Sequence, residues 1–376
     1  MKLTISKSEL ARAVAAADKF SSGNPLGIDG YFMFDAKGGE STLRASRSGM
    51  TAIINLNCES DSDGSFLVYA AKLKQIISKA PDGDLFFEVE GSDIKVTSSK
   101  KKVRYTMKAM DSGRFPDFPN IEGKTVKGGG EWFLKGLSYV RRASANDVTR
   151  EMMCSVRLEF DKEGLKMVAT DGKRLHEYTV EDFFLDGTEK AAVLLPSGFV
   201  DSLCAAVKGG DLEFLVGERE FRVKTSSGLF ATPYVNLQYP NYERVIPKDN
   251  PNIISFNRED LLGALERAAV INEFVILEKK GSVVSVSASN SDIGESSEDI
   301  ELVKNEGQPS PDFKMKLNLG HLKDSLNQNA SDLVFFNYMD GDKAFVVEQP
   351  GLDCSSEEQL KKQGCGMAVL MPMRLD

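Results

Sequence analysis

Three stretches of the chain share one order of hydrophobic and polar positions. In each, an apolar strand-like run is followed by a short helical segment and then by a second strand that opens on Asp-Leu. Alternating apolar residues indicate a half-buried strand, and i, i+3, i+4 spacing indicates an amphipathic helix. The first runs are 65–69, 191–195 and 313–317, the helices 71–80, 197–207 and 318–329, and the second strands open at Asp84, Asp211 and Asp332. A recurrence about every 120 residues predicts duplicated domains, because solenoid repeats are much shorter.

A second helix is predicted earlier in each third. Its apolar positions are Leu10, Ala13, Val14 and Ala17 in the first copy, Leu134, Leu137 and Val140 in the middle copy, and Leu261, Leu262, Leu265 and Ala268 in the last. Asn257 has the side chain of a helix N-cap, with Asp260 three residues later. Between the two helices of each third lie alternating runs that predict strands, at 42–56, 165–180 and 283–302.

Proline-containing segments separate the three copies. Phe118-Pro119-Asn120-Ile121 closes the first, and Tyr239-Pro240-Asn241-Tyr242 closes the second. Because proline fixes φ and cannot donate to a strand ladder, both segments are interpreted as linkers. The sequence therefore predicts an α+β protein of three similar domains, at residues 1–124, 125–249 and 250–376.

Composition narrows the functional class. Apolar residues make up 41% and charged residues 27%, with no apolar run long enough to span a membrane. The five cysteines have no CxxC spacing, and there are only two histidines, His176 and His321. We therefore expect a cytoplasmic protein with no metal site and no cofactor. The net charge of −9 lies mostly in the last third, so general adhesion to nucleic acid is disfavoured.

Three segments carry a resemblance to a known family. These are Ala169-Thr170-Asp171-Gly172-Lys173-Arg174-Leu175, then 239–247 with Arg244-Val245-Ile246-Pro247, and finally Met371-Pro372-Met373-Arg374-Leu375. In order and separation they resemble the marker segments of the bacterial sliding clamp, the beta subunit of DNA polymerase III, and the resemblance extends over the whole chain. It implies a head-to-tail homodimer closed into a ring, with helices inside and sheets outside. Such a ring encircles duplex DNA and tethers polymerases, as a processivity factor and not as an enzyme.

The resemblance also implies how DNA and the second subunit are contacted. Sliding requires weak, sequence-independent phosphate contacts, for which the predicted helices offer Lys7, Arg12, Lys19, Lys72, Lys74, Lys79, Arg141 and Arg142. The dimer contact would join a basic edge, Lys100 to Met107, to an acidic one in the last third. Its residues are Arg104, Tyr105, Met107, Val270, Ile271, Glu295, Glu298 and Asp299. Asp292 would add to that negative charge.

A pocket for partner proteins is the third implication. In the family it accepts a short motif, a glutamine followed by aliphatic and aromatic residues. The implied partners are the polymerase alpha subunit, the clamp loader and repair polymerases. The matching positions are Met153, Thr170, Gly172, Lys173, Arg174, Leu175, Pro240, Arg244, Val245, Val369, Met371, Pro372, Met373, Arg374 and Leu375. Methionine and leucine make an adaptable apolar groove, and the arginines would hold the peptide.

The chain departs from the family pattern at a few places. Lys173 stands where histidine is frequent, the segment 352–364 is long and charged, and Asp376 adds a carboxylate. Two other readings are possible: a clamp paralogue that acts only as a protein scaffold, and a phosphate-ester enzyme built on Asp171, Lys173, Arg174 and His176. The enzyme is disfavoured because no glycine-rich phosphate loop or metal-ligand spacing accompanies these residues.

Overall fold

The computed structural model describes residues 1–100, 103–181, 183, 190–303, 310–326, 332–349 and 364–375. The chain forms two compact units, one of residues 1–130 and 201–234, the other of residues 131–200 and 235–376. Some residues named in the sequence analysis lie outside the described residues: Lys101, Lys102, most of 352–364 and Asp376. Among those residues no helix has the length and apolar character needed to cross a bilayer.

The first unit contains two antiparallel sheets. One has the order β5-β1-β7-β8-β9 and the other β10-β15-β16-β17-β4-β3-β2-β6. The strands of the first sheet are β1 (Lys2–Ser6), β5 (Glu59–Ser60), β7 (Asp84–Glu90), β8 (Asp93–Ser98) and β9 (Arg104–Lys108). Those of the second are β2 (Tyr31–Lys37), β3 (Glu40–Arg47), β4 (Met50–Leu56), β6 (Gly64–Tyr69), β10 (Gly123–Gly129), β15 (Asp211–Gly217), β16 (Glu220–Thr225) and β17 (Gly228–Pro233).

The second unit also contains two antiparallel sheets. Their orders are β14-β11-β12-β13-β25-β24-β23-β18 and β21-β20-β19-β22. The first comprises β11 (Ser155–Asp161), β12 (Gly164–Thr170), β13 (Arg174–Val180), β14 (Ala191–Pro196), β18 (Asn252–Asn257), β23 (Leu333–Tyr338), β24 (Phe345–Gln349) and β25 (Cys365–Leu370). The second comprises β19 (Phe274–Lys280), β20 (Val283–Asn290), β21 (Gly294–Glu301) and β22 (Phe313–Asn318).

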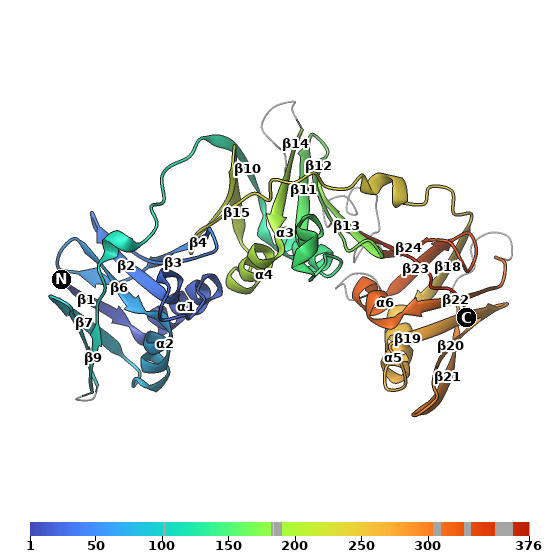
Figure 1. Ribbon diagram of the computed structural model, residues 1–376, viewed down its shortest axis with the longest axis horizontal. Helices are drawn as coiled ribbons and strands as arrows, with labels where there is room; N and C mark the ends of the chain where they lie inside the picture. Colours follow the sequence, from blue (N-terminus) through green and yellow to red (C-terminus); the bar gives the residue numbers. More distant parts are fainter. Residues whose placement is uncertain are drawn as a thin grey trace. The chain divides into compact units, whose positions relative to one another are not determined.

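Each α-helix starts where a strand ends, as the sequence predicts. The helices are α1 (Lys7–Ala17), α2 (Ala70–Lys79), α3 (Gly130–Arg141), α4 (Ser197–Ala206), α5 (Arg258–Ala268) and α6 (Leu319–Leu326). In the first unit α1 and α2 pack beside each other, and in the second α5 packs beside α6 (Figure 1). The α1 stripe of Leu10, Ala13, Val14 and Ala17 is fully buried. Burying apolar surface contributes about 25 cal/mol per Å². Packing of such apolar stripes therefore supplies most of the stability of these helices.

Helix starts follow from local side chains. The Asn257 side chain accepts hydrogen bonds from the backbone N–H groups of Glu259 and Asp260, at 2.9 and 3.3 Å, which confirms the predicted N-cap of α5. Ser6 caps α1 in the same way, accepting from the N–H of Glu9 at 3.2 Å. These caps satisfy backbone donors that a helix leaves unpaired in its first turn.

The two units do not coincide with the three expected domains. Strands β10 and β15–β17 continue the sheet formed by β2, β3, β4 and β6, whereas β11–β14 pair with β25 through β13. The expected middle domain, residues 125–249, thus contributes strands to both compact units. The division into three domains describes the sequence repeat, and it stays a prediction.

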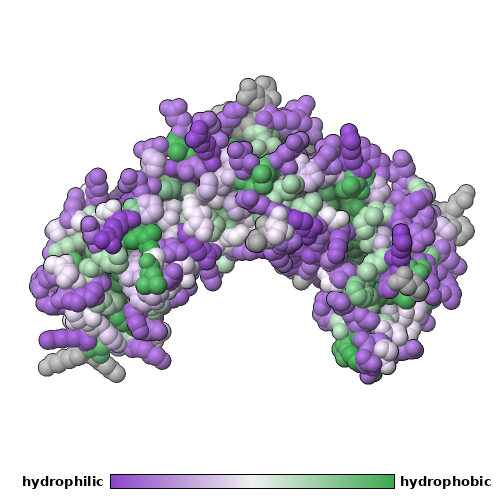
Figure 2. All heavy atoms as spheres, in the orientation of Figure 1, coloured by the Kyte–Doolittle hydropathy of each residue, from purple (hydrophilic) through white to green (hydrophobic). Residues whose placement is uncertain are grey.

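Hydrophilic side chains cover most of the drawn surface, broken by small apolar patches (Figure 2).

Candidate partner-binding pocket and contact surfaces

A pocket of about 230 Å³ opens in the second unit. Four separate segments supply its walls: the 3-10 helix Val148–Cys154, the end of β12 with the turn into β13, the stretch around Tyr242, and the end of β25. Its lining residues are Met153, Thr170, Gly172, Lys173, Arg174, Leu175, Pro240, Asn241, Tyr242, Val245, Val369 and Met371. The side chains are mainly apolar, and such pockets bind ligands through a few polar groups placed among apolar ones.

The turn between β12 and β13 is held by its own side chains. The Asp171 carboxylate accepts the backbone N–H groups of Lys173 and Arg174, at 2.8 and 3.0 Å. The Thr170 hydroxyl donates to the carbonyl of Arg174 at 2.6 Å and accepts the N–H of Gly172 at 3.1 Å. Gly172 has a φ of +86°, which side-chain-bearing residues rarely adopt. This local network explains why a Thr-Asp-Gly segment forms a rigid pocket wall.

Arg174 is committed to the protein itself. Its Nε donates to Asp171 at 3.2 Å, one terminal nitrogen donates to Asp324 of α6 at 2.6 Å, and the other to the carbonyl of Arg142. Its side chain is 11% exposed. Arg174 also lines the pocket, and its expected role in holding a partner peptide stays a prediction. The guanidinium ties the pocket wall to α6 and to the residue after α3.

The opposite wall rests on buried tyrosines. Tyr239 and Tyr242 pack with Leu175 and Val369 in one buried apolar cluster. The Tyr242 hydroxyl donates to the Glu159 carboxylate at 3.0 Å. Burial, followed by the charge of Glu159, raises the pKa of Tyr242, so the hydroxyl stays protonated as a donor. The segment around Pro240, which was interpreted as a linker, is thus anchored in the core of the second unit.

The structure brings most of the predicted pocket residues together. Those that line the cavity are Met153, Thr170, Gly172, Lys173, Arg174, Leu175, Pro240, Val245, Val369 and Met371. Arg244, Pro372, Met373, Arg374 and Leu375 do not line it. After Met371 the chain runs beside β22, where the N–H of Met373 donates to the carbonyl of Lys316 at 2.7 Å. Sequence reasoning missed Asn241 and Tyr242, although their position inside a quoted motif was a usable signal.

Several predicted DNA-facing cations are paired within the protein. Arg12 forms a bidentate ion pair with Glu9, Lys74 pairs with Asp18 at 2.7 Å, and Lys7 pairs with Asp82 at 3.1 Å. Arg12, Lys19 and Lys74 line one open groove between α1, α2, the end of α4 and the turn after β16. Lys72 and Lys79 are exposed on α2, where the Lys72 ammonium donates to the Gln75 side chain at 3.3 Å. Arg141 ends α3, and its side chain donates to Ser144 at 2.8 Å, whereas Arg142 follows the helix.

The predicted interface residues lie on or next to two sheet edges. β9, with Arg104, Tyr105 and Met107, is an edge strand of the first unit, and β21, with Glu295, Glu298 and Asp299, is an edge strand of the second. Val270 is 74% exposed just beyond α5, with Ile271 next to it. Glu298 forms an ion pair with Arg267 at 2.6 Å. Along each edge one row of ladder groups has no strand partner among the described residues.

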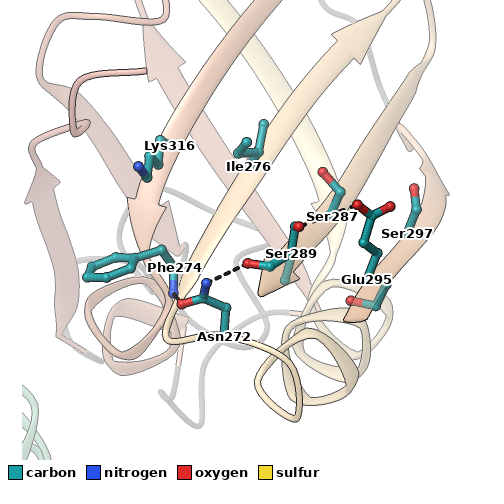
Figure 3. Close-up of a pocket in the computed structure, with 10 residues that line it drawn as sticks. Asn272, Phe274, Ile276, Ser287, Ser289, Glu295, Ser297 and Lys316 are labelled. Atoms are coloured by element: carbon teal, nitrogen blue, oxygen red, sulfur yellow. Dashed lines mark hydrogen bonds between the residues drawn. The ribbon is translucent and has the colours of Figure 1, made fainter. Parts of the chain in front are cut away.

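A shallow groove adjoins β21 on the solvent-facing side of its sheet. Figure 3 shows Phe274 and Ile276 of β19 beside three serines, Ser287, Ser289 and Ser297, with Lys316 and Glu295 also in view. The Asn272 side chain fixes the start of β19: it donates to the carbonyl of Ser289 at 2.6 Å and accepts the N–H of Phe274 at 3.1 Å. The groove therefore combines apolar side chains of β19 with polar side chains of β20 and β21 up to the β21 edge.

Comparison with known proteins identifies the family. Residues 1–121 match the N-terminal domain of the DNA polymerase III beta subunit, and residues 243–361 match its C-terminal domain. The beta sliding clamp of Pseudomonas aeruginosa is 24% identical over 326 residues, 83% of this chain and 82% of the relative. That of Caulobacter vibrioides is 23% identical over 373 residues, 93% of this chain and 96% of the relative.

Solved structures show the same fold. The DNA polymerase III subunit beta of Pseudomonas aeruginosa superposes with a TM-score of 0.87 at 20% identity. The Helicobacter pylori beta clamp bound to a DNA ligase peptide superposes with a TM-score of 0.86 at 18% identity. In both comparisons 100% of each chain is covered. With family matches at both ends and one fold throughout, the chain belongs to the DNA polymerase III beta subunit family, the beta sliding clamps.

Proposed function

We propose that this protein is a DNA sliding clamp, a processivity factor that encircles duplex DNA and tethers a replicative polymerase to it. The observation that carries the proposal is the family match at both ends of the chain, joined to a clamp fold over its full length. A topological link needs no tight DNA affinity, which is compatible with a net charge of −9. The proposal assigns no catalytic residue.

Ring closure would join β9 of one copy to β21 of a second copy. On β9, Arg104, Thr106 and Lys108 point away from the buried side of the sheet, since Tyr105 and Met107 lie opposite the buried Val96 and Ile94. On β21 the corresponding solvent-facing residues are Glu295, Ser297 and Asp299, because they pair with Ser289, Ser287 and Ser285. Joining the strands would place a basic row beside an acidic row and would cover both open edges.

The dimer proposal has a direct test. Light scattering after gel filtration at 1–10 µM, a range in which stable dimers persist (Kd about 1 µM or below), should give twice the mass of 41.3 kDa. Arg104→Glu should shift the protein towards monomer by placing like charges across the joint, and adding Asp299→Arg should restore the dimer. Lys162→Glu, an exposed change on the turn after β11, is the matched control. A wild-type monomer, or a dimer unaffected by Arg104→Glu, would contradict this interface.

DNA contact is proposed to be weak and sequence-independent. Ion pairs such as Arg12–Glu9 and Lys74–Asp18 reduce the positive charge that these residues offer to phosphates. Lys19 and Lys79, whose ammonium groups form no ion pair with the described residues, are the stronger candidates on the first unit. Weak contacts suit a protein that must slide, because each phosphate contact releases a counterion and so raises the affinity for DNA, which would slow movement along it.

Partner proteins are proposed to dock in the pocket between Gly172, Val245 and Met371. Its adaptable apolar lining suits the aliphatic and aromatic residues of a short linear motif. By resemblance, the partners are the polymerase alpha subunit, the clamp loader and repair polymerases. The relative bound to a DNA ligase peptide is consistent with peptide recognition by this fold.

A retention assay tests the function as a whole. The protein is loaded onto a nicked circular plasmid by a clamp loader, the DNA is cut once, and retention is followed by gel filtration. A sliding ring stays on the circles and leaves the linear DNA by its ends. Equal retention on both forms would mean ordinary DNA affinity, and the sliding clamp would then be rejected. The monomeric Arg104→Glu variant should not be retained on circles.

A further inference from the structure

Two methionines from separate segments line the partner pocket. Met153 belongs to the 3-10 helix Val148–Cys154, and Met371 directly follows the end of β25. Met371 is 53% exposed, so solvent reaches its side chain although that side chain lines the cavity. A thioether packs as an apolar group, but its sulfur can be oxidised to a sulfoxide, which is polar. The pocket lining therefore contains an accessible side chain whose polarity can change.

The sulfur atoms of the two methionines differ in their surroundings. Arg150 donates to the Met153 sulfur, with 3.6 Å between Nη1 and the sulfur. When a thioether donates a lone pair to a peroxide, positive charge develops on the sulfur, and a neighbouring guanidinium opposes this. The Met371 sulfur has no hydrogen-bond donor within the described part of the chain. Met371 is therefore the more reactive of the two.

Other methionines provide internal comparisons. Met167 is 0% exposed and Met315 is 1% exposed, so an oxidant reaches them only when the fold opens locally. Met373 is 39% exposed and lies two residues after Met371, but it does not line the pocket. Met371 and Met373 are thus both accessible from solvent, whereas only a change at Met371 alters the pocket lining.

From these positions we infer that Met371 is a modification site, and that its oxidation by hydrogen peroxide weakens the binding of partner peptides. The inference rests on the proposed function, because it adds a means of regulation to the same pocket. One oxygen atom passes from the peroxide to the sulfur, the O–O bond breaks, and the remaining oxygen leaves as water. The sulfur is oxidised by two electrons and the peroxide is reduced by two. A sulfoxide oxygen covered by an apolar peptide side chain loses its hydrogen bonds to water, which disfavours binding.

Peptide binding before and after peroxide treatment tests the inference. Full-length protein is incubated with hydrogen peroxide and then with dithiothreitol, which reverses cysteine oxidation to disulfide or sulfenic acid. Burial raises the pKa of the Cys154 thiol next to Met153, so little reactive thiolate is present there. Peptide mass spectrometry measures the sulfoxide at each methionine. Fluorescence anisotropy with fluorescein-labelled Gln-Leu-Ser-Leu-Phe, which contains no sulfur, measures the Kd.

Each variant is compared with its own untreated sample, so a change in basal affinity does not enter the comparison. The Kd of the wild type should rise about tenfold as Met371 is oxidised, and methionine sulfoxide reductases A and B together should restore it. Met371→Leu should remove this response, whereas the matched control Met373→Leu should respond like the wild type. Met371→Gln, which carries a polar side chain of similar length, should bind the peptide weakly before any treatment.

The results that would overturn the inference leave the pocket itself intact. They are a Kd that stays unchanged once Met371 is fully oxidised, a response that persists in Met371→Leu, and oxidation of Met373 while Met371 stays unmodified. If the untreated wild type does not bind the peptide, the pocket proposal is wrong, and its regulation by oxidation is rejected with it.

Discussion

His176 should make the second unit sensitive to mild acid. The residue lies on β13 next to the pocket residue Leu175 and is completely buried. Its Nδ1 lies 3.0 Å from the carbonyl of Tyr139, and its ring stacks on that tyrosine at 4.5 Å. A carbonyl only accepts, so Nδ1 carries the proton, and Nε2 has no hydrogen-bond partner among the described residues. A second proton would have to be placed on this buried Nε2.

Burial is the main cause that lowers the pKa of His176 from 6.5 to about 3, and the charges of Arg174 and Arg142 add to it. Between these two pKa values the unfolded chain binds a proton at His176, whereas the folded chain does not. The resulting stability is present above pH 6.5 and is lost as the pH falls towards 3. Between pH 7 and pH 5 the loss from this one residue is about 2 kcal/mol, at 1.36 kcal/mol per pH unit once the unfolded imidazole is protonated.

Urea unfolding followed by tryptophan fluorescence measures this loss. Trp132, the only tryptophan, lies on α3, the helix that also carries Tyr139, so its signal reports on the second unit. The unfolding free energy of the wild type should fall between pH 7 and pH 5 by about 2 kcal/mol more than that of His176→Gln. His321→Gln keeps His176 and should retain most of the dependence. Equal pH dependence of wild type and His176→Gln, or an imidazole NMR titration midpoint for His176 near 6.5, would refute the reasoning.

Three other substitutions have defined outcomes. Asp324→Asn should weaken binding of a pocket peptide several-fold and lower the unfolding free energy by about 1 kcal/mol, because Arg174 loses a charged partner. Asp324 does not itself line the pocket, so the effect on binding would act through Arg174. Unchanged peptide affinity in fluorescence anisotropy would show that Arg174 does not position the pocket wall. Gly172→Ala should lower the unfolding free energy by about 1–2 kcal/mol in urea unfolding, because a φ of +86° is strained for alanine. The new Cβ itself has room, since the nearest side-chain atom would be 3.7 Å away. A stability equal to that of the wild type would mean that the turn relaxes. Asn257→Ala should cost about 1 kcal/mol by removing the α5 cap. Calorimetry that shows no change in Tm would indicate that water or a shifted helix start replaces the cap.

Sequence alone determined the elements and the family. Period-2 and period-3.6 patterns depend on which face of a single strand or helix is buried, so they can be recognised without knowing the partner element. This is why 197–207 was predicted as a helix and is observed as α4, and why Asn257 was recognised as a cap. The turn Thr170–Leu175 is equally local, because its hydrogen bonds join residues no more than four positions apart.

Only the tertiary structure decided how the side chains are used. Arg174 and Asp324 are 150 positions apart in the sequence. The Arg174 guanidinium reaches the Asp324 carboxylate only because β13 pairs with β25 and α6 packs against β25. The same holds for Lys74 and Asp18, whose pairing reduces a charge that the sequence counted as available for DNA. Tyr239, in a segment interpreted as a linker, is buried against β12 and β25 residues that are distant in the sequence. Ion pairing and burial of this kind depend on sheet order and register, which no local pattern specifies.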